Sequence, residues 1–166
     1  MGEFAIGQGV PRFEDPRLVR GGGRYTDDVQ LPGMAYGVVV RSPHGHAKIT
    51  SIDVEAAKAS PGVLAVITGS DWKAAGLGDL PSHPGLKRRD GSAMYKPRYH
   101  VLAEDHVRWT GDPVAFVVAD TLTQALDAAE LVQVEYEELP AVTTTEDAIK
   151  PGADLREIGP GHWAAV

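Results

Sequence analysis

The chain has 166 residues, which suits one domain with a real core, whereas two independent domains of this total length would each be marginal. Hydrophobic residues make up 43% and charged residues 23%, a balance typical of a soluble globular protein, and apolar runs such as residues 114–119 are too short for a transmembrane helix. The net charge of −7 argues against nucleic acid binding, and the absence of cysteine excludes disulfides and the thiolate ligands of iron–sulfur clusters. The N-terminus lacks a basic region followed by an apolar block, so we predict a cytoplasmic location.

Residues 1–33 are rich in Gly, Pro and Arg, with Gly21-Gly22-Gly23 and Leu31-Pro32-Gly33 as breaks. This composition predicts an extended N-terminal arm that lies on a partner surface. Strand composition begins at residue 34 and continues to residue 41, where Ser42-Pro43 ends it, because the residue before proline favours extended backbone. A second strand is predicted over residues 47–52.

The middle of the chain alternates short helices and strands. Asp53 is a plausible N-cap for a helix that Pro61-Gly62 ends, residues 63–68 read as a buried strand, and a short helix over residues 69–75 closes at Gly76. The next segment, residues 77–99, is dense in Gly, Pro and charge. We predict a long irregular loop there, of the kind that is usually functional or ordered by a partner.

A tight turn at Gly111-Asp112-Pro113 precedes the apolar run of residues 114–119, which predicts a buried strand. Thr121 and Gln124 fit a capping box, with each side chain accepting or donating at the first helical turn. Helical spacing predicts one buried face, made of Leu122, Ala125, Leu126, Ala129 and Val132. A half-exposed strand over residues 131–138 follows, and the two strands would form a right-handed crossover if they lie parallel in one sheet. A last short helix is predicted over residues 145–149.

Two groups of residues are candidates for an interface or a structural site. The first is the turn Arg41, Ser42, His44 and His46, whose two histidines could bind a metal on a strand, although we favour hydrogen bonding to backbone groups at a turn. The second is Arg108, Gly111 and Asp112, of which Asp112 and Arg108, together with Arg41, could form a buried ion pair or a contact between domains. No catalytic, cofactor-binding or metal-binding residue is predicted. Acid–base catalysis by Glu135 and Glu137 is not expected, because the alternation of residues 133–137 places both on a solvated face.

Separate sequence blocks, taken together, resemble one known family. They are Pro11-Arg12-Phe13-Glu14-Asp15-Pro16-Arg17-Leu18, Gly23-Arg24-Tyr25-Thr26-Asp27-Asp28, Arg41-Ser42-Pro43-His44-Gly45-His46-Ala47, Gly111-Asp112-Pro113-Val114-Ala115 and Val134-Glu135-Tyr136-Glu137-Glu138-Leu139-Pro140-Ala141-Val142. With shorter matches at Pro61-Gly62-Val63 and Thr68-Gly69, they resemble the N-terminal hammerhead domain of the molybdenum-binding large subunit in the xanthine dehydrogenase, aldehyde oxidase and carbon monoxide dehydrogenase family.

The resemblance implies an α/β (α+β) hammerhead-like single domain with an extended N-terminal arm. On this basis residues 1–33 form the arm, residues 34–150 the hammerhead domain, and residues 151–166 a tail that is the truncated start of the cofactor-binding region. The family's molybdopterin, FAD and [2Fe-2S] clusters are implied for a holoenzyme and for none of this chain's residues. The implied partners are the remaining cofactor-binding region of the large subunit, an iron–sulfur subunit and a flavin subunit.

The function implied is that of a non-catalytic part of a molybdenum hydroxylase, contributing to a subunit interface and a substrate channel. As the chain stops near the point where cofactor-binding domains should begin, we expect an engineered piece, a truncated reading frame or a split subunit that catalyses nothing alone. The alternative is a stand-alone assembly or small-ligand-binding module without redox chemistry. We also expect the isolated chain to self-associate through surfaces that partners would cover.

Overall fold

The computed structural model describes residues 9, 12–81, 87, 89–93, 99–148 and 150–151, together with the backbone of residues 155–159 and 162–165. The chain divides into two compact units, Met1–Met34 and Ala35–Val166, and each is described by itself. The described residues of the first unit form two short helical turns, α1 (Asp15–Leu18) and the 3-10 helix η1 (Thr26–Asp28), neither of which buries a residue. The predicted arm is therefore not extended throughout.

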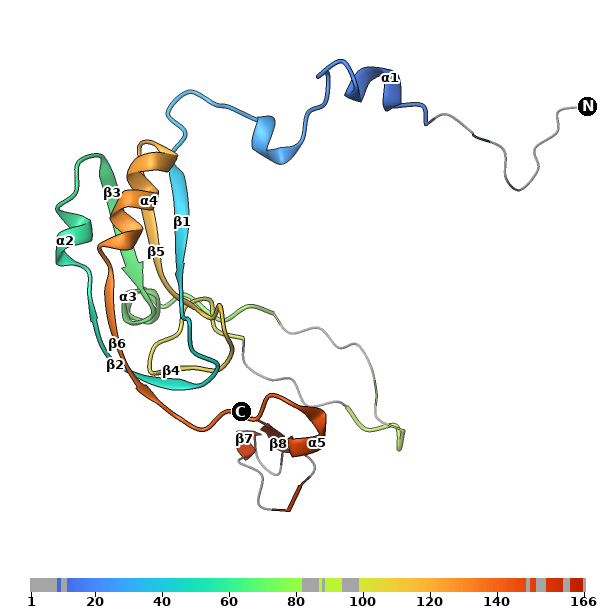
Figure 1. Cartoon of the computed structure of the whole chain (residues 1–166), viewed down its shortest axis with the longest axis vertical. Coiled ribbons are helices and arrows are strands. Elements are labelled where there is room, and N and C mark those ends of the chain that lie inside the picture. Colours follow the sequence, from blue (N-terminus) through green and yellow to red (C-terminus); the bar gives the residue numbers. More distant parts are fainter. Residues whose placement is uncertain are drawn as a thin grey trace, which may run out of the picture. The chain divides into compact units, whose positions relative to one another are not determined.

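Within the described residues of the second unit lie two three-stranded antiparallel sheets (Figure 1). In the first, β5 (Pro113–Ala119) lies between β1 (Tyr36–Arg41) and β3 (Val63–Thr68). The uninterrupted apolar sequence of β5 fits this central position, because a central strand is paired along both of its edges. Register pairs Val39 with Phe116 and Phe116 with Ile67 across the sheet.

The second sheet has the order β4-β2-β6, with β2 (Ala47–Asp53) between the short β4 (His106–Val107) and β6 (Gln133–Glu138). Alternation along β6 is as predicted: Val134 and Tyr136 are half-buried, whereas Glu135 is exposed. The predicted crossover between residues 114 and 136 is wrong in its premise, because β5 and β6 belong to different sheets. The helix between them links two sheets and spans no parallel pair.

Two adjoining clusters of buried side chains form the core of the second unit. One centres on Ala47, Val107 and Val114 at the β2–β4 side. The other joins Val66 and Val117 of the first sheet to small residues on the two helices that cover it, α2 (Glu55–Lys58) and α4 (Leu122–Glu130). Figure 1 shows α4 lying along this sheet.

The buried face of α4 differs from the prediction. Ala125 and Ala128 have no exposed surface, whereas Leu122 and Leu126 are 51% and 48% exposed. Small side chains let the helix approach β1 and β5 closely, and the leucines lie to one side of that contact. Half of the predicted capping box is present: Thr121 Oγ1 accepts from the Gln124 N–H. The Gln124 side chain does not bond the backbone of Thr121, because its oxygen accepts from the Thr121 hydroxyl instead.

The other short helices are close to their predicted places. The N-cap of α2 is Val54, and Asp53 lies one residue earlier, where its carboxylate accepts from the Glu55 N–H. Helix α3 (Gly69–Ala74) begins with a full capping box, in which Thr68 and Asp71 each bind the other's backbone N–H.

The long loop and the C-terminal segment carry further structure. In the described part of the loop, Leu80 bridges Tyr99 and Lys87 bridges Ala93, so its two sides run antiparallel, while residues 82–86, 88 and 94–98 lie outside the described residues. After α5 (Thr145–Ala148), the predicted helix end at Ile149 also lies outside them, and β7 (Leu155–Gly159) pairs with β8 (His162–Ala165) in a hairpin that sequence patterns did not predict. No helix in the described part of the chain has the length and hydropathy that a bilayer crossing requires.

Candidate functional site

A buried carboxylate stands at the corner where β1 ends and β5 begins. Asp112 is fully buried, its Oδ1 lies 2.8 Å from His100 Nε2, and its Oδ2 accepts from the Arg108 backbone N–H at 2.9 Å. Gly111 makes this turn with a φ of 91°, a conformation that favours glycine. We call the group formed by Ser42, His44, His100, Trp109, Asp112 and Tyr136 the corner cluster.

The main chain of the turn is tied to the end of β1. The Gly111 N–H donates to Ser42 O at 2.7 Å, and the Ser42 N–H donates to Asp112 O at 2.9 Å. Arg41 Nη1 donates to Gly111 O at 2.9 Å. Residues 70 positions apart in the sequence are therefore joined by several short hydrogen bonds, which makes the corner one rigid unit.

The predicted ion pair has different partners in the structure. A buried ion pair of Asp112 with Arg41 or Arg108 was one of two interpretations, the other being a contact between domains, and in the structure the partner of the carboxylate is His100. The Arg41 guanidinium binds a backbone carbonyl, and that of Arg108 donates to His106 O and lies 3.9 Å from Asp105. Only the backbone of Arg108 contacts Asp112, so the site depends on the imidazole and not on either arginine.

His100 is held from a second side by an aromatic ring. The rings of His100 and Trp109 stack with centroids 5.5 Å apart and planes inclined by 13°. His100 has 19% of its side chain exposed, whereas Trp109 is 43% exposed. The stack places an apolar surface over a histidine–carboxylate pair and shields it from water, which strengthens the hydrogen bond.

Ser42 connects the buried carboxylate to the second sheet. Its side chain is 2% exposed, its Oγ accepts from the His44 N–H at 3.0 Å, and it is hydrogen-bonded to the Tyr136 phenol. Burial is the largest influence on Tyr136 and raises the pKa of the phenol, the Asp112 carboxylate raises it further, and the bond to Ser42 opposes both. The net pKa of Tyr136 is above its ordinary value, so the phenol is neutral at physiological pH.

The two histidines of the turn contact different groups. His44 Nδ1 lies 3.1 Å from Glu138 Oε1, and its ring packs on Tyr136 with centroids 4.8 Å apart. His46 Nδ1 lies 2.7 Å from Pro140 O, and because a carbonyl only accepts, this nitrogen carries the hydrogen. His46 therefore bonds a backbone group, as the hydrogen-bonding interpretation expects, whereas His44 contacts a side-chain carboxylate of β6. Within the described residues no group of three His, Cys, Asp or Glu side chains is placed to bind a metal.

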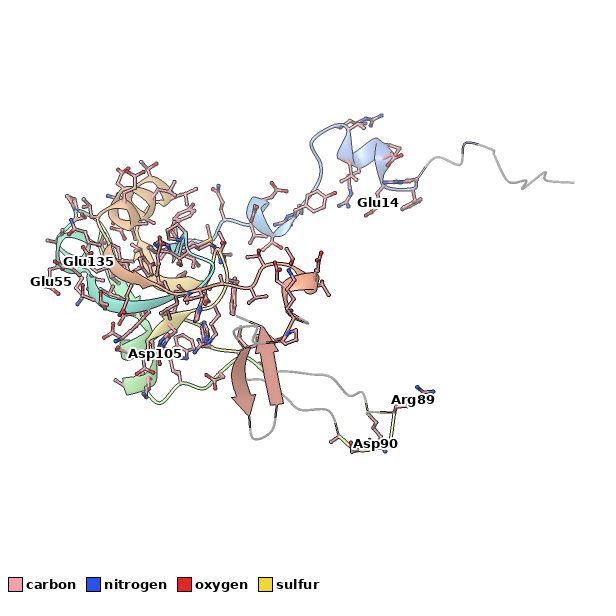
Figure 2. All side chains as sticks on the ribbon, turned by 60° about the horizontal axis from the view of Figure 1, so that its bottom comes forward. Glu14, Glu55, Arg89, Asp90, Asp105 and Glu135 are labelled. Atoms are coloured by element: carbon pink, nitrogen blue, oxygen red, sulfur yellow. The ribbon has the colours of Figure 1, made fainter. Side chains whose placement is uncertain are left out.

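Several charged side chains outside the corner cluster lie at the outer edge of the second unit or around a hollow beside β2. Figure 2 shows Glu55 and Glu135 at the outer edge of the second unit. A hollow of about 360 Å³ lies beside β2 and the start of α3, lined by hydroxyl side chains together with Lys58, Asp71 and Glu104. Lys58 pairs with Glu55, Asp71 caps α3, and Glu104 binds Lys73, so the charges around this hollow already have partners in the chain.

The corner cluster holds no complete catalytic group. A histidine–carboxylate pair can act as a general base only towards a hydroxyl or thiol within reach. In the described residues His100 has no hydroxyl hydrogen-bonded to it, and Ser42 instead binds His44 and Tyr136. The contacts of the cluster join the turn before β5 to the end of β1 and, through the ring contact of His44 with Tyr136, to β6 of the second sheet.

Sequence reasoning missed His100, Trp109 and Tyr136 as members of this site. His100 lies 12 residues before Asp112, at the end of an irregular loop where no periodicity assigns it a side. The one signal was local: Trp109 immediately precedes the Thr110-Gly111-Asp112 turn and is therefore held close to it.

Comparison with known proteins decides the family. The family model for the aldehyde oxidase and xanthine dehydrogenase a/b hammerhead domain matches residues 20–140. The chain belongs to this family. The predicted hammerhead-like α/β fold is thereby confirmed, and so is the resemblance on which it rested.

Hammerhead relatives of this chain include the large chains of several oxidoreductases. It is 46% identical to the carbon monoxide dehydrogenase large chain of Afipia carboxidovorans, over 87% of this chain and 16% of that one. It is 40% identical to the xanthine dehydrogenase molybdenum-binding subunit of Escherichia coli O157:H7, over 81% of this chain and 17% of that protein. A crystal structure of a Cu,Mo-containing CO dehydrogenase matches with a TM-score of 0.74 and 43% identity, over 90% of this chain and 18% of that one. The chain therefore spans less than a fifth of these proteins.

Proposed function

We propose that this chain is the hammerhead part of a molybdenum hydroxylase large subunit and that it supplies structure and not catalytic groups. The observation that carries the proposal is the family match over residues 20–140 combined with a span of only 16% of the Afipia carboxidovorans large chain. In this proposal residues 1–33 are the arm, residues 34–150 the hammerhead domain, and residues 151–166 the start of the cofactor-binding region, all in a cytoplasmic complex.

The holoenzyme we propose uses molybdopterin, FAD and [2Fe-2S] clusters, all of them bound outside this chain. The residues present do not fit those groups. The sequence has no cysteine to hold a cluster, and the fully buried carboxylate of Asp112 has both oxygens occupied by His100 and Arg108. We therefore derive no redox step from these residues.

The role we propose is to shape a subunit interface and the approach of substrate. Three segments are suited to it: the arm, the turn from Arg41 to His46, and the loop over residues 77–99. The corner cluster supports the idea because it fixes two of them together, with His100 at the end of the loop and Ser42 in the turn both tied to Asp112. The partners proposed are the rest of the large subunit, an iron–sulfur subunit and a flavin subunit.

The experiment is a pull-down of the tagged chain from its native cells, with mass spectrometry of the bound chains and molybdenum analysis of the complex. We expect molybdopterin-, flavin- and iron–sulfur-containing chains in fixed ratio. An Asp112→Ala variant disrupts the corner and should lower recovery of the same partners. Recovery of the wild-type chain alone, without molybdenum, would instead support the stand-alone assembly or ligand-binding module.

A further inference from the structure

One face of the β1–β5–β3 sheet has no covering element within the described part of the chain. Strand alternation and register place on it two rows across three strands: Gly37, Val118 and Ala65, then Val39, Phe116 and Ile67. None of these six residues belongs to, or packs against, either core cluster. The opposite face carries Val66 and Val117, which pack with Ala57 of α2 and Ala128 of α4. We call the six-residue surface the open face.

The open face has the composition of a core and lacks that of a solvated surface. All six residues are uncharged and apolar, five of them are half-buried, and Gly37 is exposed. A side chain at Gly37 would overlap the Phe116 ring, so the glycine lets that ring lie flat across the neighbouring strand. The result is a smooth apolar surface with no charge inside it.

The second sheet of the same molecule shows how this chain builds a face that meets water. There the outward positions of β6 are Gln133, Glu135 and Glu137, and Lys48 on β2 lies 3.9 Å from Glu137. Antiparallel sheets with one solvated face carry polar residues on that face. The contrast within one chain indicates that the open face is suited to contact with other apolar groups, whereas the outer face of β6 is suited to water.

We propose that the open face is covered by the remainder of the large subunit, which packs on it as a second core layer. This inference rests on the proposed function and goes further by assigning the surface. This chain spans 16% of the Afipia carboxidovorans large chain and 18% of the matching chain in the Cu,Mo-containing CO dehydrogenase structure, so more than four-fifths of their length is available to cover the open face. A second copy is a poorer occupant, because two whole chains that each carry a net charge of −7 repel one another.

The test uses the Afipia carboxidovorans carbon monoxide dehydrogenase large chain with its matching segment replaced by this chain. Three variants are compared with the unmodified chimera: Val39→Lys with Ile67→Lys, the milder Val39→Thr with Ile67→Thr, and the control Leu122→Lys. Leu122 is 51% exposed on α4, which covers the opposite face. The measurements are soluble large chain and molybdenum per chain, and the same variants are made in the isolated chain for thermal unfolding.

We expect the lysine pair to lower the yield of molybdenum-loaded chimera at least about tenfold, because a covered apolar contact does not tolerate an unpaired charge. The threonine pair should lower it several-fold, and Leu122→Lys should change it by less than about twofold. In the isolated chain, the unfolding midpoints should all stay within about 4 °C of the wild type. An effect confined to the complete large subunit is the signature of a face covered by the remainder.

Two results would overturn this assignment while leaving the proposed function in place: lysine-pair chimeras that load molybdenum like the unmodified one, or a loss of stability from both pairs in the isolated chain as well. An unmodified chimera that takes up no molybdenum would overturn the proposed function and the inference together. A contact between copies that persists in the loaded chimera and is broken by the lysine pair would assign the face to a second copy and reject the proposal.

Discussion

At the scale of single residues, Asp112 connects three parts of the chain: the end of the long loop, the turn before β5 and the end of β1. Its carboxylate binds a loop histidine and a backbone N–H, and its own main chain joins the end of β1. A buried carboxylate is stable in this position only because both oxygens have donors. The hydrogen bonds that offset the cost of burying the Asp112 carboxylate therefore also fix the end of the loop and the turn.

Replacing Asp112 by alanine should lower the free energy of unfolding by about 3–5 kcal/mol, because His100 and the Arg108 N–H lose their buried acceptor. Urea unfolding measures the change. Asp127→Ala is the control, since Asp127 is exposed on α4, and we expect less than about 0.5 kcal/mol there. Similar losses in both variants would contradict a special role for the buried pair.

Tyr136 gives the corner a dependence on alkaline pH. Its pKa is raised in the folded state by burial and by Asp112, so its contribution to stability is fully present below the unfolded pKa of about 10 and is lost as pH rises through the folded value. Tyr136→Phe should cost about 1 kcal/mol at neutral pH through loss of the bond to Ser42. The variant should then lose less stability than the wild type above about pH 10.

The measurement is urea unfolding at a series of pH values from about 8 to 11, on both sides of the unfolded tyrosine pKa. Tyr99→Phe is the matched control, because the ring of Tyr99 is 47% exposed. Parallel stability curves for the wild type and Tyr136→Phe would show that the phenol does not couple its ionisation to folding.

At the scale of elements, a close approach of the Ala103 backbone explains why glycine, a poor helix former, stands at the first position of α3. Gly69 opens α3, where alanine would ordinarily be favoured by up to about 1 kcal/mol. A Cβ there would lie 2.8 Å from the carbonyl carbon of Ala103, which is main chain and cannot rotate away. We expect Gly69→Ala to destabilise the protein by about 1–3 kcal/mol through overpacking.

Gly78→Ala is the control for this prediction, because a Cβ at Gly78 meets nothing within 4 Å. Thermal unfolding of both variants compares them directly. If Gly69→Ala unfolds at the wild-type temperature or above it, helix propensity outweighs the contact with Ala103 and the packing described for α3 is wrong.

Helix α4 shows where pattern reasoning stops. The spacing of apolar residues correctly predicts a helix near Leu122 with an apolar face. It does not say which residues of that face lie at the centre of the contact with the sheet. The structure centres it on Ala125 and Ala128 and leaves Leu126 half-exposed. What decides this is the distance to the sheet, which small side chains shorten, and that distance is a tertiary quantity absent from the local sequence.

At the scale of the whole molecule, ordered blocks of sequence predicted the family and its fold, since turns such as Gly111-Asp112-Pro113 and strand composition are local properties. The pairing of strands was not predictable in the same way. Nothing in residues 114–138 tells whether β5 and β6 share a sheet, because both have strand character and a helix of suitable length between them. The corner cluster was half predicted for the same reason: its turn is local, and His100 reaches it only through the fold.

The division into two units leads to the last prediction, which concerns removal of the arm. Neither α1 nor η1 buries a residue, and Phe13, Val19 and Tyr25 are 99%, 82% and 65% exposed. Deleting residues 1–33 should therefore change the free energy of unfolding of the remaining chain by less than about 0.5 kcal/mol. Partner recovery in the pull-down should fall about tenfold, because large exposed apolar side chains are typical of interfaces.

Phe13→Ser in the full-length chain tests the contact made by this side chain separately from the length of the arm, and it should lower partner recovery and leave urea unfolding unchanged. Leu31 is 66% exposed next to the end of the arm. Leu31→Ser therefore tests how far along the arm the contact with the partner extends. A deletion that destabilises the rest by several kcal/mol would instead make the arm part of the folding core, since a loss of that size requires buried contacts. A deletion that leaves partner recovery intact would confine the interface to residues 34–166 and move the arm's exposed aromatic residues out of the assembly.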